Sequence, residues 1–346
     1  MASRFRLLDL NEDCLKTVLQ CFDGLDLISF SLCSKKMLAN VRSLKFHIEL
    51  RLICGTTFNA YFNFGGHLIE LFFCENGYDR LVDQRDDRPR RLQVDYIEGC
   101  YPYAHLDRQD DNQELTIRRW RRANFRGNDW LRHFMVVFNC DKIGSMFVEK
   151  SKFEVDSVVD IVQNLNIASF GNWQNITKQH TLSLLRAQPC LENLSVDALT
   201  FDEPSEYSIL LRNQQRLNIQ TTEITRDIAL SVNSLALHCS GLSINDANRF
   251  IKLWKKGANP RLRYLWVIFI ANHAGAVALN ENEVLRGIQY RRMPQGTVRM
   301  FEMPGNRMEE IDGGFDIIGK NGRKATVILY NHEEEEVSFF QMFIWQ

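Results

Sequence analysis

The chain has 346 residues, and its 42 Lys and Arg nearly balance its 43 Asp and Glu, which leaves a net charge of −1. This balance gives no overall attraction to nucleic acid or to an anionic membrane surface, so we predict neither as a partner. The hydrophobic content of 45% suffices for one large domain or for two to three smaller ones. The longest apolar run, Leu265 to Leu279, is interrupted by polar residues and is too short to span a bilayer.

Nine cysteines are scattered along the chain without a C-x-x-C pair. This spacing favours neither a zinc ribbon nor a thioredoxin-type site, and we expect no metal and no cofactor. Cysteines within apolar runs are typical of small buried residues in a reducing compartment. The first residues, which include Arg4, Arg6 and Asp9, lack the clean apolar stretch of a signal sequence. We therefore expect a protein of the cytoplasm, the nucleus or both.

Residues 5–44 predict three short helices. Between Leu15 and Phe22 apolar residues recur at i, i+3, i+4 and i+7, which places them on one face of a first helix. A second helix is expected to begin at an Asp26 cap and a third at a Ser34 cap, because these side chains accept hydrogen bonds from free backbone N–H groups.

These forty residues carry more apolar side chains than one helix face can bury. The surplus either packs on the rest of the chain or forms a docking surface for another protein, and the pattern alone leaves both open. The residues concerned are Leu7, Leu8, Leu10, Leu25, Leu27, Ile28, Phe30 and Leu32.

The segment resembles an F-box in its Leu10–Asp13 helix start, its Asp26-Leu27 opening and its Ser31–Lys35 stretch. One departure is Asn11, which stands where the family usually has Pro; Asn is a good N-cap, so the helix start is retained. The resemblance implies docking onto the Skp adaptor of an SCF (Skp–cullin–F-box) ubiquitin ligase. The residues expected at that interface are Leu8, Leu10, Asn11, Leu15, Val18, Leu19, Leu25, Leu27, Ile28, Phe30 and Leu32.

Beyond this module, residues 46–53 are expected to continue as helix, and aromatic residues around Gly65-Gly66 predict two strands joined by a turn. Residues 78–126 are highly charged and predict a long surface loop or an irregular strand pair. Five arginines between 118 and 126 form a basic cluster. We expect it to face solvent beside the acidic run 107–114, with nucleic-acid binding as the less favoured alternative.

An apolar-x-x-apolar-x-apolar pattern then recurs four times, starting at Val162, Leu191, Val232 and Leu262. A degenerate copy near Leu217 divides the longest interval. Helical stretches between the copies make the pattern typical of an irregular leucine-rich-repeat-like solenoid. The alternative is chance recurrence in a leucine-rich α/β protein.

A solenoid usually presents its strand face to a partner. Outward residues at the third position of each copy are therefore our candidates for binding a target protein, with the charged loop as a second candidate. These residues are Asn164, Asn193, Ser234 and Tyr264.

The tail has strand character from Thr297 onwards, and Asn321-Gly322 is a strong hairpin signal. The predicted fold is α+β. A three-helix F-box (residues 5–50) precedes a β-rich segment with a long charged loop (57–150), and an irregular leucine-rich-repeat-like α/β solenoid with β-hairpin additions follows (151–346).

The second half is similar to the type 2 F-box-associated domain in its phrase Phe250–Leu262, which contains Leu253-Trp254 and Gly257-Ala258-Asn259-Pro260. Segments Trp130–Cys140 and Asp316–Thr326 add to this similarity. The pairing implies a substrate receptor in which the C-terminal domain binds the target, which the resemblance does not identify.

Catalytic motifs are absent from the sequence: there is no G-x-S-x-G, P-loop, G-x-G-x-x-G or H-E-x-x-H. Only His238-Cys239 brings His and Cys side by side, and adjacent strand residues face opposite ways. The sequence thus gives no reason to assign a reaction, and the F-box resemblance implies a non-catalytic subunit, a substrate-recognition adaptor of an SCF ligase. The alternative is a protein-binding scaffold independent of any ligase, in which the N-terminal helices only cap the following domain.

Overall fold

The protein is described by a computed structural model. The described residues are 7–76, 89–101, 117–172, 176–197, 204–220, 231–240, 242–270, 278–332 and 337–345. They form two compact units. The first comprises Met1–Ser169 with Asn175–Cys190, and the second comprises Phe170–Gln174 with Leu191–Gln346.

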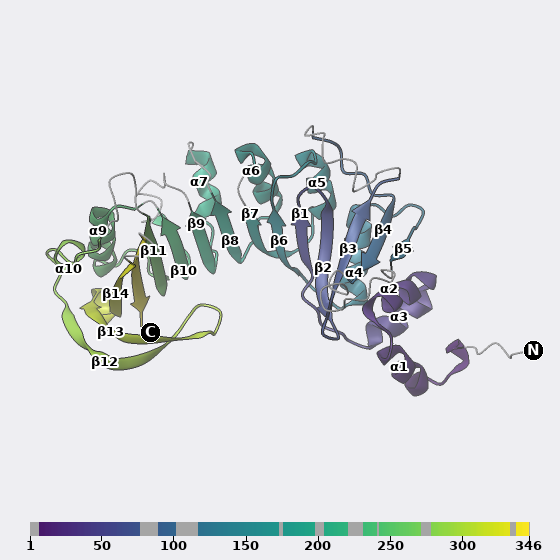
Figure 1. The fold of residues 1–346 in the computed structure, drawn as a ribbon, viewed down its shortest axis with the longest axis horizontal. Helices are drawn as coiled ribbons and strands as arrows, with labels where there is room; N and C mark the ends of the chain where they lie inside the picture. The colour runs from purple at the N-terminus through teal and green to yellow at the C-terminus, as the bar shows by residue number, and fades with distance from the viewer. Residues whose placement is uncertain are drawn as a thin grey trace, which may run out of the picture. The chain divides into compact units, whose positions relative to one another are not determined.

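The first unit opens with a short 3-10 turn, η1 (Leu7–Asp9), and three helices, α1 (Glu12–Gln20), α2 (Gly24–Cys33) and α3 (Lys35–Ser43) (Figure 1). Two of the expected caps are confirmed: Asn11 accepts from the Cys14 N–H at 2.8 Å, and Ser34 accepts from the Met37 N–H at 3.2 Å. The expected Asp26 cap is wrong. Asp23 caps α2 instead, by accepting from the Asp26 N–H at 2.7 Å.

Residues 46–53 do not continue the helix, contrary to expectation. Lys45 takes a positive φ of 52°, which ends helical hydrogen bonding after α3. The chain then enters strand β1 (Arg51–Cys54), which pairs antiparallel with β2 (Phe58–Phe64) and parallel with β6 (Ile143–Val148).

The strands of the first unit follow the order β6-β1-β2-β3-β4-β5, with β3 at His67–Cys74, β4 at Tyr96–Cys100 and β5 at Arg118–Trp120. The predicted β2–β3 turn is confirmed, with positive φ at Gly65 and Gly66. The charged segment contains β4 and β5, so its strand-pair alternative is correct for these residues.

Helices α4 (Gly127–Val137), α5 (Val155–Val162) and α6 (Lys178–Ala187) complete the first unit. The apolar side chains of α4 are largely buried, with Trp130 and Phe134 fully enclosed. Strand β7 (Ile167–Asn172) spans the division between the units.

The second unit begins with four parallel strands, β8 (Asn193–Asp197), β9 (Arg216–Gln220), β10 (Ala236–Ser240) and β11 (Tyr264–Ile270). Helix α7 (Pro204–Leu210) lies between β8 and β9 in the chain, and α9 (Ile244–Lys255) between β10 and β11. The degenerate copy near Leu217 is indeed a strand, β9. Parallel strands joined through helices agree with the α/β part of the prediction; the leucine-rich-repeat assignment stays a prediction.

The tail is antiparallel throughout, in the order β11-β15-β14-β13-β12. Its elements after α10 (Glu281–Val284) are β12 (Arg291–Glu302), β13 (Met308–Ile318), the turn η3 (Lys320–Gly322), β14 (Lys324–His332) and β15 (Val337–Ile344). The predicted hairpin is confirmed, with positive φ at Asn321 and Gly322. Figure 1 shows β12 and β13 as a long curved pair. Over the described residues, no helix has both the length and the apolar character to cross a membrane.

Candidate functional site

Helix α2 is fastened to the rest of the first unit by hydrogen bonds from two other elements. The Ser31 hydroxyl lies 2.9 Å from Nε2 of His133 on α4, and the Trp120 indole N–H of β5 donates to the Ser29 hydroxyl at 2.9 Å. These partners are 102 and 91 residues apart in the chain, so no local sequence pattern could have identified them. The N-terminal helices are therefore built into the first unit.

The proton arrangement at His133 follows from its partner. The Ser31 hydroxyl donates to the Ile28 carbonyl at 2.7 Å, so it accepts from the His133 Nε2–H. Burial, and to a smaller extent the nearby Arg122 cation, lower the pKa of His133 to about 4. The imidazole is consequently neutral at pH 7 and acts as a hydrogen-bond donor to α2.

Two glycines let α2 approach the sheet closely. A Cβ at Gly24, the first residue of α2, would collide with the side chain of Ile69 on β3. A Cβ at Gly99 on β4 would lie 2.8 Å from a methyl carbon of Leu25 and 2.7 Å from the Trp120 ring. Any larger residue at either position would push the helix away from the strands.

Part of the predicted adaptor interface lies in the interior. Leu25, Leu27 and Ile28 have no exposed surface, and Leu15 and Leu19 are 7% and 1% exposed. In this conformation these side chains pack within the first unit and cannot reach a partner. Of the surplus residues, Leu25, Leu27 and Ile28 are thus enclosed as the packing alternative expects, and an adaptor role for any of these residues stays a prediction.

The remaining predicted residues, which lie in η1, at the start of α1 and on α1 and α2, keep exposed surface. Val18 on α1 and Phe30 on α2 are half-buried, and the Phe30 ring meets Phe22 edge-on at 5.8 Å. We name the set that keeps exposed surface the open face: Leu8, Leu10, Asn11, Val18, Phe30 and Leu32. A docking role for these residues stays a prediction.

The predicted target-binding residues of the second unit are not equivalent in the sheet. The register pairs Asn193 with Arg216, Arg216 with Ala236, and Ala236 with Tyr264. Asn193 and Tyr264 thus share a row, whereas Ser234 lies two residues before the strand position in that row. In the third copy of the pattern, which starts at Val232, strand β10 therefore begins at Ala236, two residues after the position expected for Ser234.

Only one of these three residues keeps appreciable surface. Ser234 is 1% exposed and Tyr264 is 3% exposed, whereas Asn193 is half-buried. The Tyr264 hydroxyl accepts from the Gln341 side-chain amide at 3.0 Å, and its ring packs against Phe343. Tyr264 and Ser234 therefore lie inside the second unit.

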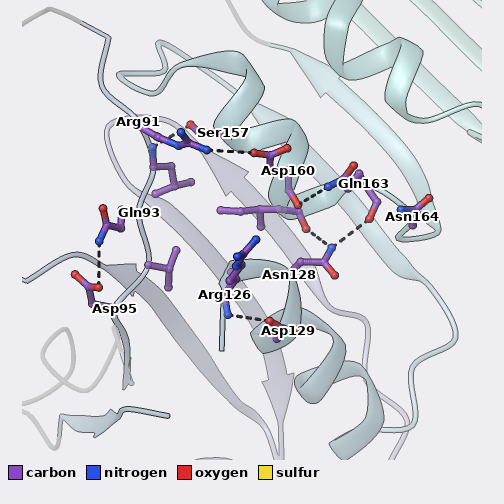
Figure 2. Close-up of a pocket in the computed structure, with 14 residues that line it drawn as sticks. Arg91, Gln93, Asp95, Arg126, Asn128, Asp129, Ser157, Asp160, Gln163 and Asn164 are labelled. Carbon is purple, nitrogen blue, oxygen red and sulfur yellow. Dashed lines mark hydrogen bonds and ion pairs between the residues drawn. The ribbon is translucent and has the colours of Figure 1, made fainter. Parts of the chain in front are cut away.

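Asn164, the fourth predicted residue, lines a hollow of about 810 Å³ in the first unit (Figure 2). It follows α5 with a positive φ of 59°, and its carbonyl accepts from Arg132 at 3.1 Å. The hollow is formed by residues 91–95, the start of α4 and the end of α5.

Most polar groups of this hollow are paired with one another. The Asn128 amide donates to the carbonyls of Ile161 and Gln163, and Arg91 lies 3.7 Å from the Asp160 carboxylate. Figure 2 shows the Arg126 side chain pointing into the space between them. Because basic and acidic side chains both line the hollow, it has no strong preference for ligands of one charge.

The basic cluster between residues 118 and 126 is engaged within the first unit. Arg118 pairs with Asp26 at 3.2 Å, and Arg119 pairs with Glu98 at 2.5 Å. The Arg122 guanidinium lies 4.4 Å from the centroid of the Phe125 ring. The predicted pairing with the acidic run 107–114 falls outside the described residues.

His238 and Cys239 occupy opposite faces of β10. Burial raises the pKa of the Cys239 thiol to about 12, so it carries almost no thiolate near neutral pH. Burial also lowers the pKa of His238 to about 4, and its ring lies between Tyr264 and Trp266 at 5.4 and 5.2 Å. In the described parts of the chain, no three His, Cys, Asp or Glu side chains come together as a metal site.

Comparison with protein families identifies two segments. Residues 7–49 match the F-box domain, which covers the three N-terminal helices, and residues 207–267 match the type 2 F-box associated domain, which covers β9 to β11. No curated protein and no solved structure matches the chain. F-box proteins are generally non-catalytic adaptors. The chain thus carries an F-box domain followed by an F-box associated domain, as its sequence resemblance predicted.

Proposed function

We propose that this protein is the substrate-recognition adaptor of an SCF ubiquitin ligase. Helices α1–α3 dock on the Skp adaptor, and the second unit, which contains the F-box associated segment, binds a target protein. Partner subunits transfer ubiquitin, and this chain raises the effective concentration of target lysines near them. The proposal places the protein in the cytoplasm, the nucleus or both.

The observation that carries the proposal is the division of the F-box helices into a buried and an open face. The buried face is occupied by this chain's own strands and by α4, so it needs no partner. The open face leaves half-buried leucines, a valine and a phenylalanine at the surface within one short segment. Apolar side chains that keep exposed surface and are concentrated in one short segment are typical of a protein-binding surface.

The test is co-purification of the full chain with a Skp adaptor. The variant Leu10→Asp with Leu32→Asp places two charges on the open face, and we expect it to lose the adaptor while it keeps its melting temperature. Leu27→Asp is unsuitable, because that side chain is fully buried and a charge there would unfold the first unit.

A matched control places the same two charges elsewhere. Val298 and Met300 on β12 are 51% and 52% exposed, so Val298→Asp with Met300→Asp changes apolar surface and charge equally outside the F-box. This control variant should bind the adaptor like the wild type. Adaptor binding that survives in the open-face variant would refute the proposal.

The alternative function is a protein-binding scaffold independent of any ligase. It is supported by the hydrogen bonds that connect α2 to α4 and β5. Those bonds show that the N-terminal helices contribute to the first unit whatever else they do. Deletion of residues 5–44 would expose Ile69 and the His133 ring under either reading, so it does not separate the two. The open-face variant does: a pure scaffold predicts that neither the wild type nor the control recovers a Skp adaptor.

A further inference from the structure

The second unit contains a hollow of about 560 Å³ where β10, β11 and β14 begin and β15 ends. Its ionisable lining residues are Arg261, Arg263, Arg323 and Lys324. No acidic residue is found among the described residues that line it. We call it the basic hollow; a one-sided charge of this kind is unexpected in a chain whose net charge is −1.

Two structured turns place these cations. The first follows α9: Gly257, with φ 102°, donates to the Trp254 carbonyl, and Ala258 donates to the Leu253 carbonyl, which is a Schellman ending. The Asn259 amide then donates to the Val232 carbonyl at 2.9 Å and fixes the turn. The chain leaves it through Arg261 and Arg263.

The second turn is the predicted Asn321-Gly322 hairpin, closed by a 2.7 Å hydrogen bond from the Gly319 N–H to the Arg323 carbonyl. It delivers Arg323 and Lys324. The two turns are joined, because the Arg323 guanidinium donates to the Leu262 carbonyl at 2.9 Å. The four cations are therefore held on rigid backbone.

The carboxylates beside the hollow are too few to neutralise these cations. Asp316 is shared, with Arg299 at 2.9 Å and Lys324 at 2.8 Å. Within the described residues, Arg263 pairs with the exposed Glu302 carboxylate at 3.6 Å and donates to the carbonyl of the same residue at 3.0 Å. Two positive charges thus compete for one buried carboxylate, and a third has a weak partner.

Arg261 and Arg323 contact backbone carbonyls and a ring but no carboxylate among the described residues. Arg261 donates to the Asn233 carbonyl at 3.2 Å, and Arg323 lies 5.6 Å from the centroid of the Trp254 ring. Partial burial lowers the pKa of Arg323, which reflects the cost of holding a cation away from water without a counter-charge. An anion in the hollow would offset that cost.

We propose that the basic hollow binds an acidic peptide segment of the target protein, an assignment that rests on the adaptor function proposed above. Guanidinium groups pair with carboxylates through two parallel hydrogen bonds, which suits Arg261 and Arg323. Pro260, Ile344 and Trp345 supply apolar wall. A peptide with Asp or Glu residues next to a hydrophobic residue matches this lining, because its carboxylates can pair with the cations while its hydrophobic side chain packs on the apolar wall.

A peptide fits these features better than nucleic acid does. Nucleic-acid surfaces extend along a backbone with many phosphate contacts, whereas the positive charge here is confined to one hollow of about 560 Å³. The apolar wall also has a use in peptide binding, since it can accept a side chain between two carboxylates.

The experiment uses the full chain bound to its Skp adaptor and a fluorescent peptide with the core Glu-Glu-Leu-Glu-Glu. Fluorescence anisotropy compares this peptide with its Gln-Gln-Leu-Gln-Gln counterpart and with a single-stranded oligonucleotide of equal charge. We expect the acidic peptide to bind at least tenfold more tightly than either. We also expect Arg261→Gln with Arg323→Gln to weaken its binding at least fivefold.

The matched control is Arg249→Gln with Arg291→Gln, two exposed arginines of the same unit that do not line the hollow. Because Arg323 stabilises its turn, a second test changes Arg261 alone and leaves this turn intact. Arg261→Glu reverses the charge, and Arg261→Lys preserves it as a control. Equal peptide affinity in wild type and in Arg261→Glu would overturn the proposal, as would preference for the oligonucleotide.

Failure of the hollow and failure of the adaptor function give different results. If the hollow assignment is wrong, the hollow variants and the wild type capture the Skp adaptor equally and also bind the peptide equally. If the adaptor function is wrong, the wild type captures no Skp adaptor. In that case the free full chain should still bind the acidic peptide more tightly than its Gln counterpart. This result would support the hollow as a peptide-binding site independently of the adaptor function.

Discussion

On α2, Leu25 and Ile28 have no exposed surface, whereas Phe30, two residues further, is half-buried on the open face. The F-box resemblance places all three at the same adaptor interface. The structure separates them by what they contact. Leu25 and Ile28 lie on the side of α2 that packs on the strands and on α4, whereas Phe30 keeps exposed surface and meets the Phe22 ring edge-on at 5.8 Å.

Under the proposed function, this difference means that one short helix serves two purposes. The buried side holds the helix in place, since enclosing a Leu or Ile side chain stabilises a fold by about 1.5–3 kcal/mol. The open side adds little stability and is free to bind. An adaptor that docks on the open face is thereby fixed in position against the rest of the first unit.

The largest effect should come from a charge on the buried side. Ile28→Asp removes apolar packing and buries a carboxylate without a partner, so we expect a loss of roughly 4 kcal/mol or more in the free energy of unfolding. Phe30→Asp removes only a half-buried ring and its contact with Phe22, so we expect a loss of about 1–2 kcal/mol together with loss of adaptor binding. Urea unfolding together with adaptor pulldown measures both. Equal stability losses in the two variants would show that the faces do not differ.

The buried side should also respond to pH through His133. Its pKa in the folded state, about 4, lies below the ordinary value of 6.5, so the unfolded chain binds more protons between these pH values. The stability contribution is full above pH 6.5 and is lost as the pH falls towards 4, by about 3 kcal/mol. His133→Gln keeps a donor for Ser31 and does not titrate.

Unfolding curves at several pH values between 4 and 8 make this comparison. The stability difference between wild type and His133→Gln should change across this range in favour of the wild type at high pH. His238, whose pKa is also about 4, lies in the second unit and is unchanged in both proteins. A difference that stays constant with pH would show that His133 does not titrate in this way.

A smaller loss is expected when the hydroxyl partner of His133 is removed. Ser31→Ala leaves the buried Nε2–H without an acceptor, which costs about 1–3 kcal/mol. Ser43→Ala is the control, because its hydroxyl bonds the Asn40 carbonyl at the exposed end of α3. Thermal melting compares the two variants. If Ser43→Ala were as damaging as Ser31→Ala, the α2–α4 contact would have no special role.

Local sequence signals predicted many of the caps and turns. They failed where two residues were equally good caps or where the sequence did not mark the end of a helix. The Asn11 and Ser34 caps and the Asn321-Gly322 hairpin follow from side-chain chemistry within a few residues. The start of α2 was misplaced by three residues, since Asp23 and Asp26 are equally good caps by composition. Nothing in the sequence marks Lys45 as a residue with positive φ, so the helix was extended too far.

The functional surfaces depend on contacts between distant segments, which periodicity does not reveal. The spacing of apolar residues could not tell which leucines of α2 face the sheet, because that depends on His133 and Trp120 far along the chain. Of the two turns of the basic hollow, the Asn321-Gly322 turn was predicted from the sequence. The contact between the two turns, through Arg323 and the Leu262 carbonyl, could not be predicted, because it depends on the strand order. In that order, β15 lies between β14 and β11.

The smallest effect concerns Asn11, the open-face residue that stands where the resemblance implies Pro. Its φ of −61° already suits Pro, and its carbonyl, which accepts from the Leu15 N–H, would be unaffected. Asn11→Pro loses the side-chain cap, worth about 1 kcal/mol, and regains about 0.4–1 kcal/mol by restricting the unfolded chain.

We therefore expect the stability of Asn11→Pro to stay within about 1 kcal/mol of the wild type. Its adaptor affinity should rise by about threefold, or about 0.7 kcal/mol, because Pro adds rigid apolar surface to the open face. Calorimetric titration with the Skp adaptor measures this, and Asn11→Ala, which loses the cap without fixing φ, is the control. A tenfold loss in Asn11→Pro would instead mean that the Asn11 amide itself contacts the adaptor. The open face would then depend on a polar contact as well as on its apolar side chains.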